Sequence, residues 1–229
     1  PTRFDLKALE EIRNTIGPFD FEALYQCSPI LTDNQTFNPS WFKYRDENEL
    51  QGRATRNFLT IDTALSQKEH ADYTGFVDNT VDSENFWNIK AWHQKLAPDK
   101  LVDTIFALHA QRRYDVIGIE KTTYTMGLKP YLDAEQRKRG TFLPITDLSH
   151  GGTQKETRIR GLIPRYASGS IYHLKGLCKD LEDEMHDFPH GRHDDILDAL
   201  AYQLQVADNP NVAVGANLEV FLPIFDWDA

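Results

Sequence analysis

From residue 56 onward, three strand-like segments precede the first long helix, and this order restricts the fold more than any other feature of the sequence. The segments NFLTIDTAL, TGFVDNTV and ENFWNIKAW are short and apolar, as in an antiparallel meander. Helices and strands then alternate: a helix introduced by Pro98, a strand at 115–120, a helix at 126–139, a strand in TFLPI, a helix in ETRIRGLIPRY that ends at Pro164, a strand in SIYHL and an amphipathic helix at 193–207. The pattern predicts an α/β fold with a mixed sheet.

The first 55 residues have a different character. The segment LKALEEIRNTIG has apolar residues at helical spacing and stops at Gly17-Pro18, and a loop rich in Asn, Asp, Pro and Ser follows. We therefore predict a lead-in helix and linker over 1–55, a main domain over 56–210 and a C-terminal tail over 211–229. A chain that opens within a helical pattern suggests a fragment of a longer protein.

The net charge of −10 is distributed unevenly. Residues 180–229 contain twelve acids and one base, whereas residues 120–165 contain nine bases and five acids. An acidic end and a basic centre are compatible with a metal site beside an anion-binding surface. A solvated acidic tail, however, explains most of the charge by itself.

Composition excludes several other classes of protein. The two cysteines lack CxxC spacing, which argues against a disulfide framework or a cysteine zinc site. No stretch approaches the roughly 20 apolar residues of a membrane span, and the N-terminus does not resemble a signal peptide. We therefore expect a soluble, intracellular protein.

Acidic residues interrupt apolar segments at three places. Asp62 lies within FLTIDTA, Glu120 closes VIGIE, and three aspartates open the last helix: Asp194, Asp195 and Asp198. A buried carboxylate is costly unless it is paired or holds a metal. Each acid alone is explained as well by a structural ion pair or, for Asp194, by an N-cap.

Together, the acids favour a metal site. If the first and fourth strands are adjacent, Asp62 and Glu120 can face one another, and a helix packed there brings Asp195 and Asp198, three residues apart, toward them. Oxygen ligands suit Mg²⁺ or Mn²⁺ better than zinc. Two such ions roughly 3.5–4 Å apart can activate water and stabilise the leaving oxygen in phosphodiester cleavage.

The meander, the strand-end Glu and the acidic helix resemble the ribonuclease-H-like, or integrase-like, fold, which carries helices on both faces of its sheet. More specifically, the chain resembles the C-terminal nuclease domain of the large terminase subunit of tailed bacteriophages. The matching segments are FEALYQCSPI, FLTIDTALSQKEHADYTG, VIGIEKTTY, KETRIRGLIPRYASGSIYHL and HDDILDALAYQ.

The resemblance implies roles for the acids. Carried over by position, the acidic triad of the family maps to Asp62, Glu120 and Asp195 as catalytic residues. The metal ligands implied are these three together with Asp194 and Asp198. The cofactor implied is Mg²⁺ or Mn²⁺, as two ions.

The activity implied is metal-dependent endonucleolytic cleavage of double-stranded DNA during viral genome packaging, in the cytoplasm of the host cell. The sequence contains no GxxxxGK[ST] motif, so ATP hydrolysis is expected in an ATPase domain elsewhere in the same polypeptide. The small terminase subunit and the portal protein are the other partners implied, and no membrane is involved.

Four basic residues are the predicted phosphate contacts: Lys121, Lys155, Arg158 and Arg160. Two alternatives remain open at this point. The chain could be a non-catalytic DNA-binding or docking module of a packaging motor, in which the acids are structural. Alternatively, the Asp-x-x-Asp-Ala-Leu spacing resembles that of Holliday-junction resolvases, which cut branched DNA.

Overall fold

The computed structural model describes residues 6–16, 36–63, 73–191 and 193–207. The strands are β1 (Lys43–Arg45), β2 (Thr55–Thr63), β3 (Tyr73–Asp82), β4 (Trp87–Lys95), β5 (Val116–Glu120), β6 (Ile145–Leu148) and β7 (Ile171–Leu174). The α-helices are α1 (Leu6–Ile16), α3 (Pro98–Arg112), α4 (Thr123–Arg139), α5 (Lys155–Arg160), α6 (Ile163–Ala167), α7 (Lys179–Asp187) and α8 (Asp195–Val206), and two 3₁₀ helices are η1 (Pro39–Trp41) and η2 (Glu47–Leu50). None of the described helices could span a bilayer.

The strands form one seven-stranded sheet in the order β1-β7-β4-β3-β2-β5-β6. β2, β3 and β4 are antiparallel neighbours, as the meander predicted. β5 pairs in parallel with β2, and β6 with β5. On the other side, β7 is parallel to β4 and β1 is parallel to β7. The predicted mixed sheet is therefore confirmed, and the first and fourth strands of the 56–210 segment are adjacent, which is the condition under which Asp62 and Glu120 can face one another.

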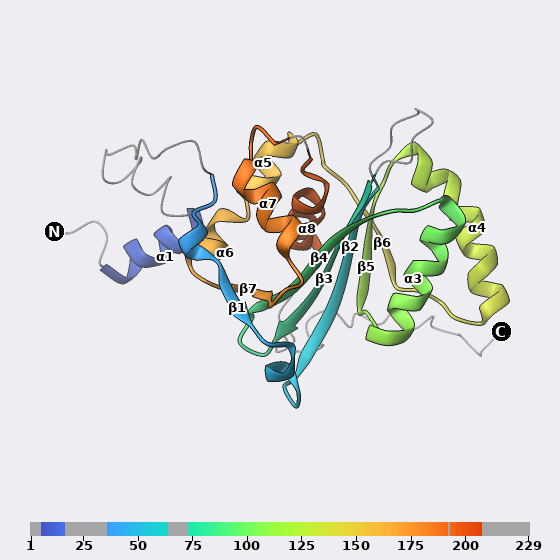
Figure 1. The fold of residues 1–229 in the computed structure, drawn as a ribbon, viewed down its shortest axis with the longest axis horizontal. Helices are drawn as coiled ribbons and strands as arrows, with labels where there is room; N and C mark the ends of the chain where they lie inside the picture. Colours follow the sequence, from blue (N-terminus) through green and yellow to red (C-terminus); the bar gives the residue numbers. More distant parts are fainter. Residues whose placement is uncertain (1–5, 17–35, 64–72, 192, 208–229) are drawn as a thin grey trace, which may run out of the picture.

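Helices cover both faces of the sheet (Figure 1). α3 and α4 pack on one face, in a core that includes Leu59 and Ile61 of β2. α5, α6, α7 and α8 pack on the other face, in a core that includes Phe58. Because side chains alternate along a strand, β2 contributes to both cores. The even-numbered residues of β2 face α8: the Thr60 hydroxyl donates to the Ala199 carbonyl oxygen at 2.6 Å.

One predicted helix boundary was wrong. The segment ETRIRGLIPRY forms two short helices, because α5 ends at Arg160 and α6 begins at Ile163 with Pro164 in its first turn. The first turn of a helix tolerates proline, since the N–H groups there have no partner within the helix. Pro164 therefore begins a helix instead of ending one.

Part of the predicted linker lies against the sheet. The three residues of β1 pair with β7, and Phe37 is buried in the core beneath α6. Residues 36–55 therefore contribute to the packing of the domain. The helix α1 corresponds to the lead-in helix predicted within residues 1–55. The predicted tail over 211–229 lies outside the described residues.

Candidate active site

The two strand-end acids occupy neighbouring strands. β2 and β5 are in parallel register from Phe58–Val116 to Ile61–Ile119, so Asp62 and Glu120 come at the next level of each strand. Asp62 is an even-numbered residue of β2 and therefore faces α8. Its side chain is only 6% exposed. Burial, followed by a hydrogen bond with Glu120 and the charge of that residue, raises the pKa of Asp62 well above its usual range.

The other three acids stand at the start of α8. Asp194 occupies the N-cap position, Asp195 is the first helical residue and Asp198 lies one turn further along. The Asp194 side chain makes no capping hydrogen bond. The capping role, which was one alternative from the sequence, is therefore excluded in this structure.

Gly75 brings the start of α8 close to Asp62. Gly75 on β3 is paired with Asp62 on β2. A Cβ atom added to Gly75 would lie 2.6 Å from the carbonyl oxygen of Asp195, which is far closer than side chains approach backbone. The missing side chain thus lets the backbone of α8 pass directly over the sheet beside the buried carboxylate.

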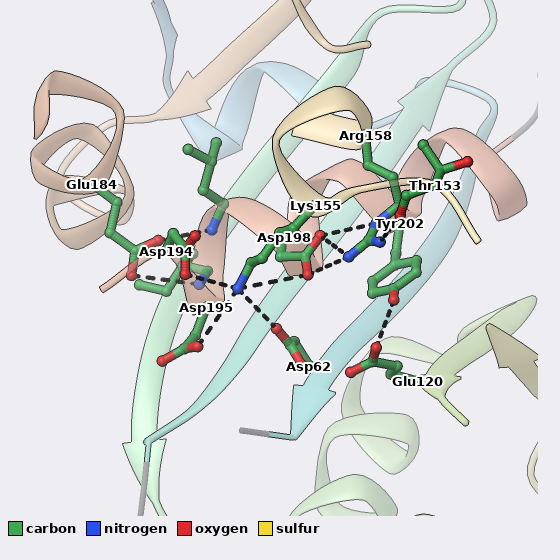
Figure 2. A network of polar contacts seen from close by, with 12 residues as sticks. Asp62, Glu120, Thr153, Lys155, Arg158, Glu184, Asp194, Asp195, Asp198 and Tyr202 are labelled. Carbon is green, nitrogen blue, oxygen red and sulfur yellow. Dashed lines mark hydrogen bonds and ion pairs between the residues drawn. The ribbon is translucent and has the colours of Figure 1, made fainter. Parts of the chain in front are cut away.

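A single lysine ammonium is placed among all four aspartates (Figure 2). Lys155 is the first residue of α5. Its Nζ lies 2.7 Å from Asp194 Oδ1, 3.6 Å from Asp198 Oδ2, 3.9 Å from Asp195 Oδ1 and 4.0 Å from Asp62 Oδ2. Burial acts to lower the pKa of Lys155, but the hydrogen bond to Asp194 and the charges of the surrounding aspartates outweigh it and raise that pKa. The ammonium is therefore held in its charged form.

Arg158, one turn after Lys155, connects α5 to α8 and to Glu120. Its Nη2 contacts Asp198 Oδ2 at 2.6 Å and Oδ1 at 2.8 Å, and its guanidinium carbon lies 4.9 Å from the centre of the Tyr202 ring. The Tyr202 hydroxyl in turn donates to Glu120 Oε1 at 2.8 Å. Burial still raises the pKa of Asp198, although Arg158 and Lys155 oppose it. Figure 2 shows this chain of contacts beside the lysine.

Glu184 on α7 holds the N-terminal end of α8. It accepts hydrogen bonds from the backbone N–H groups of Leu197, at 2.8 Å, and Ile196, at 3.4 Å. Those N–H groups have no partner within the helix, so Glu184 serves as a cap supplied by another element. Burial raises the pKa of Glu184 to about 7 in spite of these hydrogen bonds.

The other two predicted DNA contacts lie apart from the aspartates. Arg160 makes an ion pair with Glu156 on the exposed side of α5, at 2.8 Å. Lys121 follows Glu120 directly and is exposed. It lines a cavity between α4 and the β5–β6 edge together with Lys129 and Asp147. Their contact with DNA stays a prediction, as it does for Lys155 and Arg158.

The sequence was also compared with protein families and known proteins. The model of the family described as the terminase RNaseH-like domain matches residues 59–206, which include every one of these acids. The chain belongs to this family. No curated protein matches the sequence.

One solved terminase nuclease shares the fold of this terminase domain, and two other solved structures are similar to it. The large terminase nuclease from the thermophilic phage G20c, solved with bound zinc, is 18% identical, with a TM-score of 0.51 over 73% of this chain and 86% of that one. The large terminase of bacteriophage HK97 is 10% identical, with a TM-score of 0.46 over 67% of this chain and 36% of that one. RuvC from T. thermophilus, bound to a Holliday junction substrate, is 11% identical, with a TM-score of 0.37 over 65% of this chain and 95% of that one. The family match and the G20c nuclease confirm the predicted ribonuclease-H-like fold.

The donor set of this terminase domain fits a hard divalent cation, but its present arrangement does not hold one. The five acids offer only carboxylate oxygens, the ligands that Mg²⁺ and Mn²⁺ prefer. Within the described residues, no three Asp, Glu, His or Cys side chains are grouped so that they could hold one ion. In this arrangement the Lys155 ammonium lies among the aspartates, and Glu120 is hydrogen-bonded to Tyr202.

Sequence reasoning missed three residues that organise this site: Gly75, Glu184 and Tyr202. Gly75 had a visible signal, because a glycine inside a strand often marks a close approach of another backbone. Tyr202 lies four residues after Asp198 and so on the same side of α8. Glu184 had no local signal, since it is one of many acids in the acidic segment after residue 180.

Proposed function

We propose that this chain is the nuclease domain of a large terminase and cuts double-stranded DNA during viral genome packaging by divalent-metal-dependent phosphodiester hydrolysis. One observation carries the proposal. Carboxylates from β2 and from the start of α8 meet within 4.0 Å of one ammonium group, next to Glu120 at the end of β5. Two of these aspartates, Asp62 and Asp198, are buried, and a buried carboxylate costs stability unless a cation balances it.

Each acid has a place in the proposed mechanism. Asp62, Glu120 and Asp195 are the proposed catalytic carboxylates, and with Asp194 and Asp198 they would hold the cations, proposed to be two Mg²⁺ or Mn²⁺ ions. Bound there, the metal would supply an activated water and stabilisation of the leaving oxygen. The proposed products carry a 3′-hydroxyl and a 5′-phosphate.

The chain's own residues would orient the carboxylates. The Tyr202 hydroxyl fixes one oxygen of Glu120, which limits the rotation of that side chain. Arg158 binds both oxygens of Asp198 and keeps α5 against α8. Glu184 and Gly75 set the position of the first turn of α8, from which Asp195 and Asp198 project. Pre-arrangement of this kind lowers the cost of reaching the reactive geometry.

The proposed partners follow from membership of the terminase family. Double-stranded DNA would contact Lys121, Lys155, Arg158 and Arg160 through its phosphates. An ATPase domain in the same polypeptide would precede residues 1–55, of which 36–55 pack with the nuclease domain predicted over 56–210. The small terminase subunit, the portal protein and a location in the host cytoplasm belong to the same proposal.

Plasmid cleavage tests the proposed activity. The 229-residue chain is incubated with supercoiled plasmid in EDTA, in Mg²⁺ and in Mn²⁺, beside the Asp62→Asn variant. We expect metal-dependent nicking and linearisation by the wild type and none by the variant, because Asn cannot supply the negative charge of the carboxylate. A fully active Asp62→Asn variant would refute the proposed role of that residue.

The same assay separates the two alternatives. A docking module would bind DNA equally with and without metal and would cut none. A junction-specific enzyme would cut a synthetic four-way junction in preference to linear duplex of the same sequence. Cleavage of plain duplex in metal, with no preference for junctions, is the result that our proposal requires.

A further inference from the structure

Lys155 stands in an unusual place for a residue whose expected partner is DNA. Its ammonium lies within 4.0 Å of carboxylate oxygens from four aspartates, and it donates a 2.7 Å hydrogen bond to Asp194. Three of these aspartates come from the first turn of α8 and its cap, and the fourth comes from β2. One positive charge therefore links both elements of the site.

Without this charge, the ionised aspartates at the start of α8 would repel one another and oppose ionisation of Asp62. Asp62 and Asp198 are almost fully buried, with side chains 6% and 4% exposed, so water screens them poorly. Arg158 neutralises only Asp198 among the four. Among the described residues, the Lys155 ammonium is a cation within 4.0 Å of Asp62, Asp194 and Asp195 alike.

We infer that Lys155 is an internal counter-cation of the carboxylate site, which keeps the aspartates together in the metal-free protein and which a divalent cation must displace in order to bind. This inference rests on the proposed function, since the ligands concerned are the proposed metal ligands. The Lys155 ammonium lies within 4.0 Å of an oxygen of each aspartate, so a metal ion bound by the same oxygens would compete with the ammonium for this position.

The side chain has a route out of the site. The Lys155 side chain is 35% exposed to solvent. A lysine carries its charge on a flexible stem of four carbons. Arg158 anchors α5 to Asp198, so the helix can stay in place while the lysine side chain turns away. The released ammonium would then be free to contact a phosphate, which reconciles this role with the predicted DNA contact.

Metal binding tests the inference without relying on cleavage. Mn²⁺ affinity is measured by titration calorimetry, and thermal unfolding is recorded in EDTA and in Mn²⁺, for wild type, Lys155→Met and Lys129→Met. Lys129 is an exposed lysine on α4 and serves as the matched control. We expect Lys155→Met to bind Mn²⁺ about tenfold more tightly or better, because a competing positive charge is gone. We also expect a lower melting temperature in EDTA and a larger rise on adding Mn²⁺.

A second pair of variants covers the case in which Lys155→Met does not fold in EDTA. The double variant Lys155→Met/Asp194→Asn removes one positive and one negative charge. It is compared with Asp194→Asn alone, as in a double-mutant cycle, so that the two proteins differ only at Lys155. The double variant should bind Mn²⁺ about tenfold more tightly than the single one.

The outcomes distinguish this inference from the proposed function. Equal Mn²⁺ affinity with and without Lys155, in a wild type that binds Mn²⁺ and cuts DNA, overturns the counter-cation and leaves the nuclease standing. Failure of wild type and both Lys155 variants to bind Mn²⁺ overturns both. Equal tightening in Lys129→Met would show a general charge effect and would also overturn the inference.

Discussion

At the scale of single residues, Asp62 shows that the site is built at the expense of stability. Its carboxyl group lies on the α8 side of a central strand and is buried, and its pKa is raised chiefly by that burial. A carboxyl group with a raised pKa in the folded state keeps its proton there after the unfolded chain has lost it. This proton stabilises the folded state fully at pH values below the pKa that Asp62 has in the unfolded chain. The stabilisation is lost as the pH rises through the pKa that Asp62 has in the folded protein.

Asp62→Asn should therefore change the pH dependence of stability. In EDTA, the free energy of unfolding of the wild type should fall between pH 5 and pH 9 by about 1–3 kcal/mol more than that of the variant, which has no proton to lose at this position. Urea unfolding at several pH values measures the difference, with Asp99→Asn on α3 as an exposed control. Parallel curves for wild type and Asp62→Asn would contradict a buried, protonated carboxyl group.

Tyr202 acts on Glu120 through one hydroxyl group, so Tyr202→Phe isolates that contact. The variant keeps the aromatic ring beneath Arg158 and removes only the 2.8 Å hydrogen bond. Loss of one such bond, worth about 1 kcal/mol, should slow metal-dependent cleavage by about fivefold. Single-turnover cleavage measures the rate, and Tyr131→Phe on α4 is the control. An unchanged rate would show that Glu120 needs no help from Tyr202.

At the scale of elements, the position of α8 decides the site. Three of the five acids lie at its N-terminal end, and that end is held by Glu184 from α7, by the close approach to Gly75 on β3 and by Arg158 from α5. The amphipathic pattern of α8 predicts that the helix exists and which side is buried. The distance from the helix to β2 depends on the absence of a side chain at one residue of a neighbouring strand.

Gly75→Ala tests the importance of this close approach. The new methyl group would meet the Asp195 carbonyl oxygen at 2.6 Å, and the helix must move. We expect a loss of about 1–3 kcal/mol in the free energy of unfolding, as for other overpacked cores, and weaker Mn²⁺ binding. Gly127→Ala on α4 meets nothing within 4 Å and should be neutral or stabilising. Mn²⁺ binding equal to that of the wild type in Gly75→Ala would show that the spacing of α8 from the sheet is not critical.

At the scale of the whole molecule, the charges divide by position in the chain. The acidic segment after residue 180 includes the start of α8, and its acids at the site are met by Lys155 and Arg158 from the basic centre. Two of the four predicted phosphate contacts, Lys155 and Arg158, are therefore already engaged with aspartates of the site, and Arg160 is paired with Glu156. Lys121 and Arg160 lie outside the carboxylate cluster.

The salt dependence of DNA binding tests these outer residues. DNA affinity is measured at several salt concentrations, with Ca²⁺ in place of Mg²⁺ to limit cleavage. In a plot of the logarithm of affinity against the logarithm of salt concentration, the slope for Lys121→Ala/Arg160→Ala should be about 1.8 less steep than that of the wild type, since each lost phosphate contact accounts for about 0.9. Fluorescence anisotropy with a short duplex gives the slopes. Lys175→Ala/Lys179→Ala, at two exposed lysines beside β7 and α7, is the control, and equal slopes in both double variants would exclude a contribution from Lys121 and Arg160.

Local patterns in the sequence predicted the mixed sheet and the meander, and they singled out the acids Asp62, Glu120, Asp194, Asp195 and Asp198; the adjacency of β2 and β5 was only assumed. The patterns are apolar periodicity and acids placed where apolar residues belong. The boundary between α5 and α6 was missed because the same proline that ends a helix can also begin one.

How the acids are held depends on contacts between elements that lie far apart in the sequence. Lys155 and Asp194 are separated by 39 residues along the chain, and no periodicity links a lysine on one short helix to aspartates on another helix and on a strand. The same applies to Glu184, which caps α8 from α7, and to Gly75, which makes room for the backbone of Asp195. Long-range ion pairs and close contacts depend on the relative placement of elements, and that placement arises from the packing of both faces of the sheet.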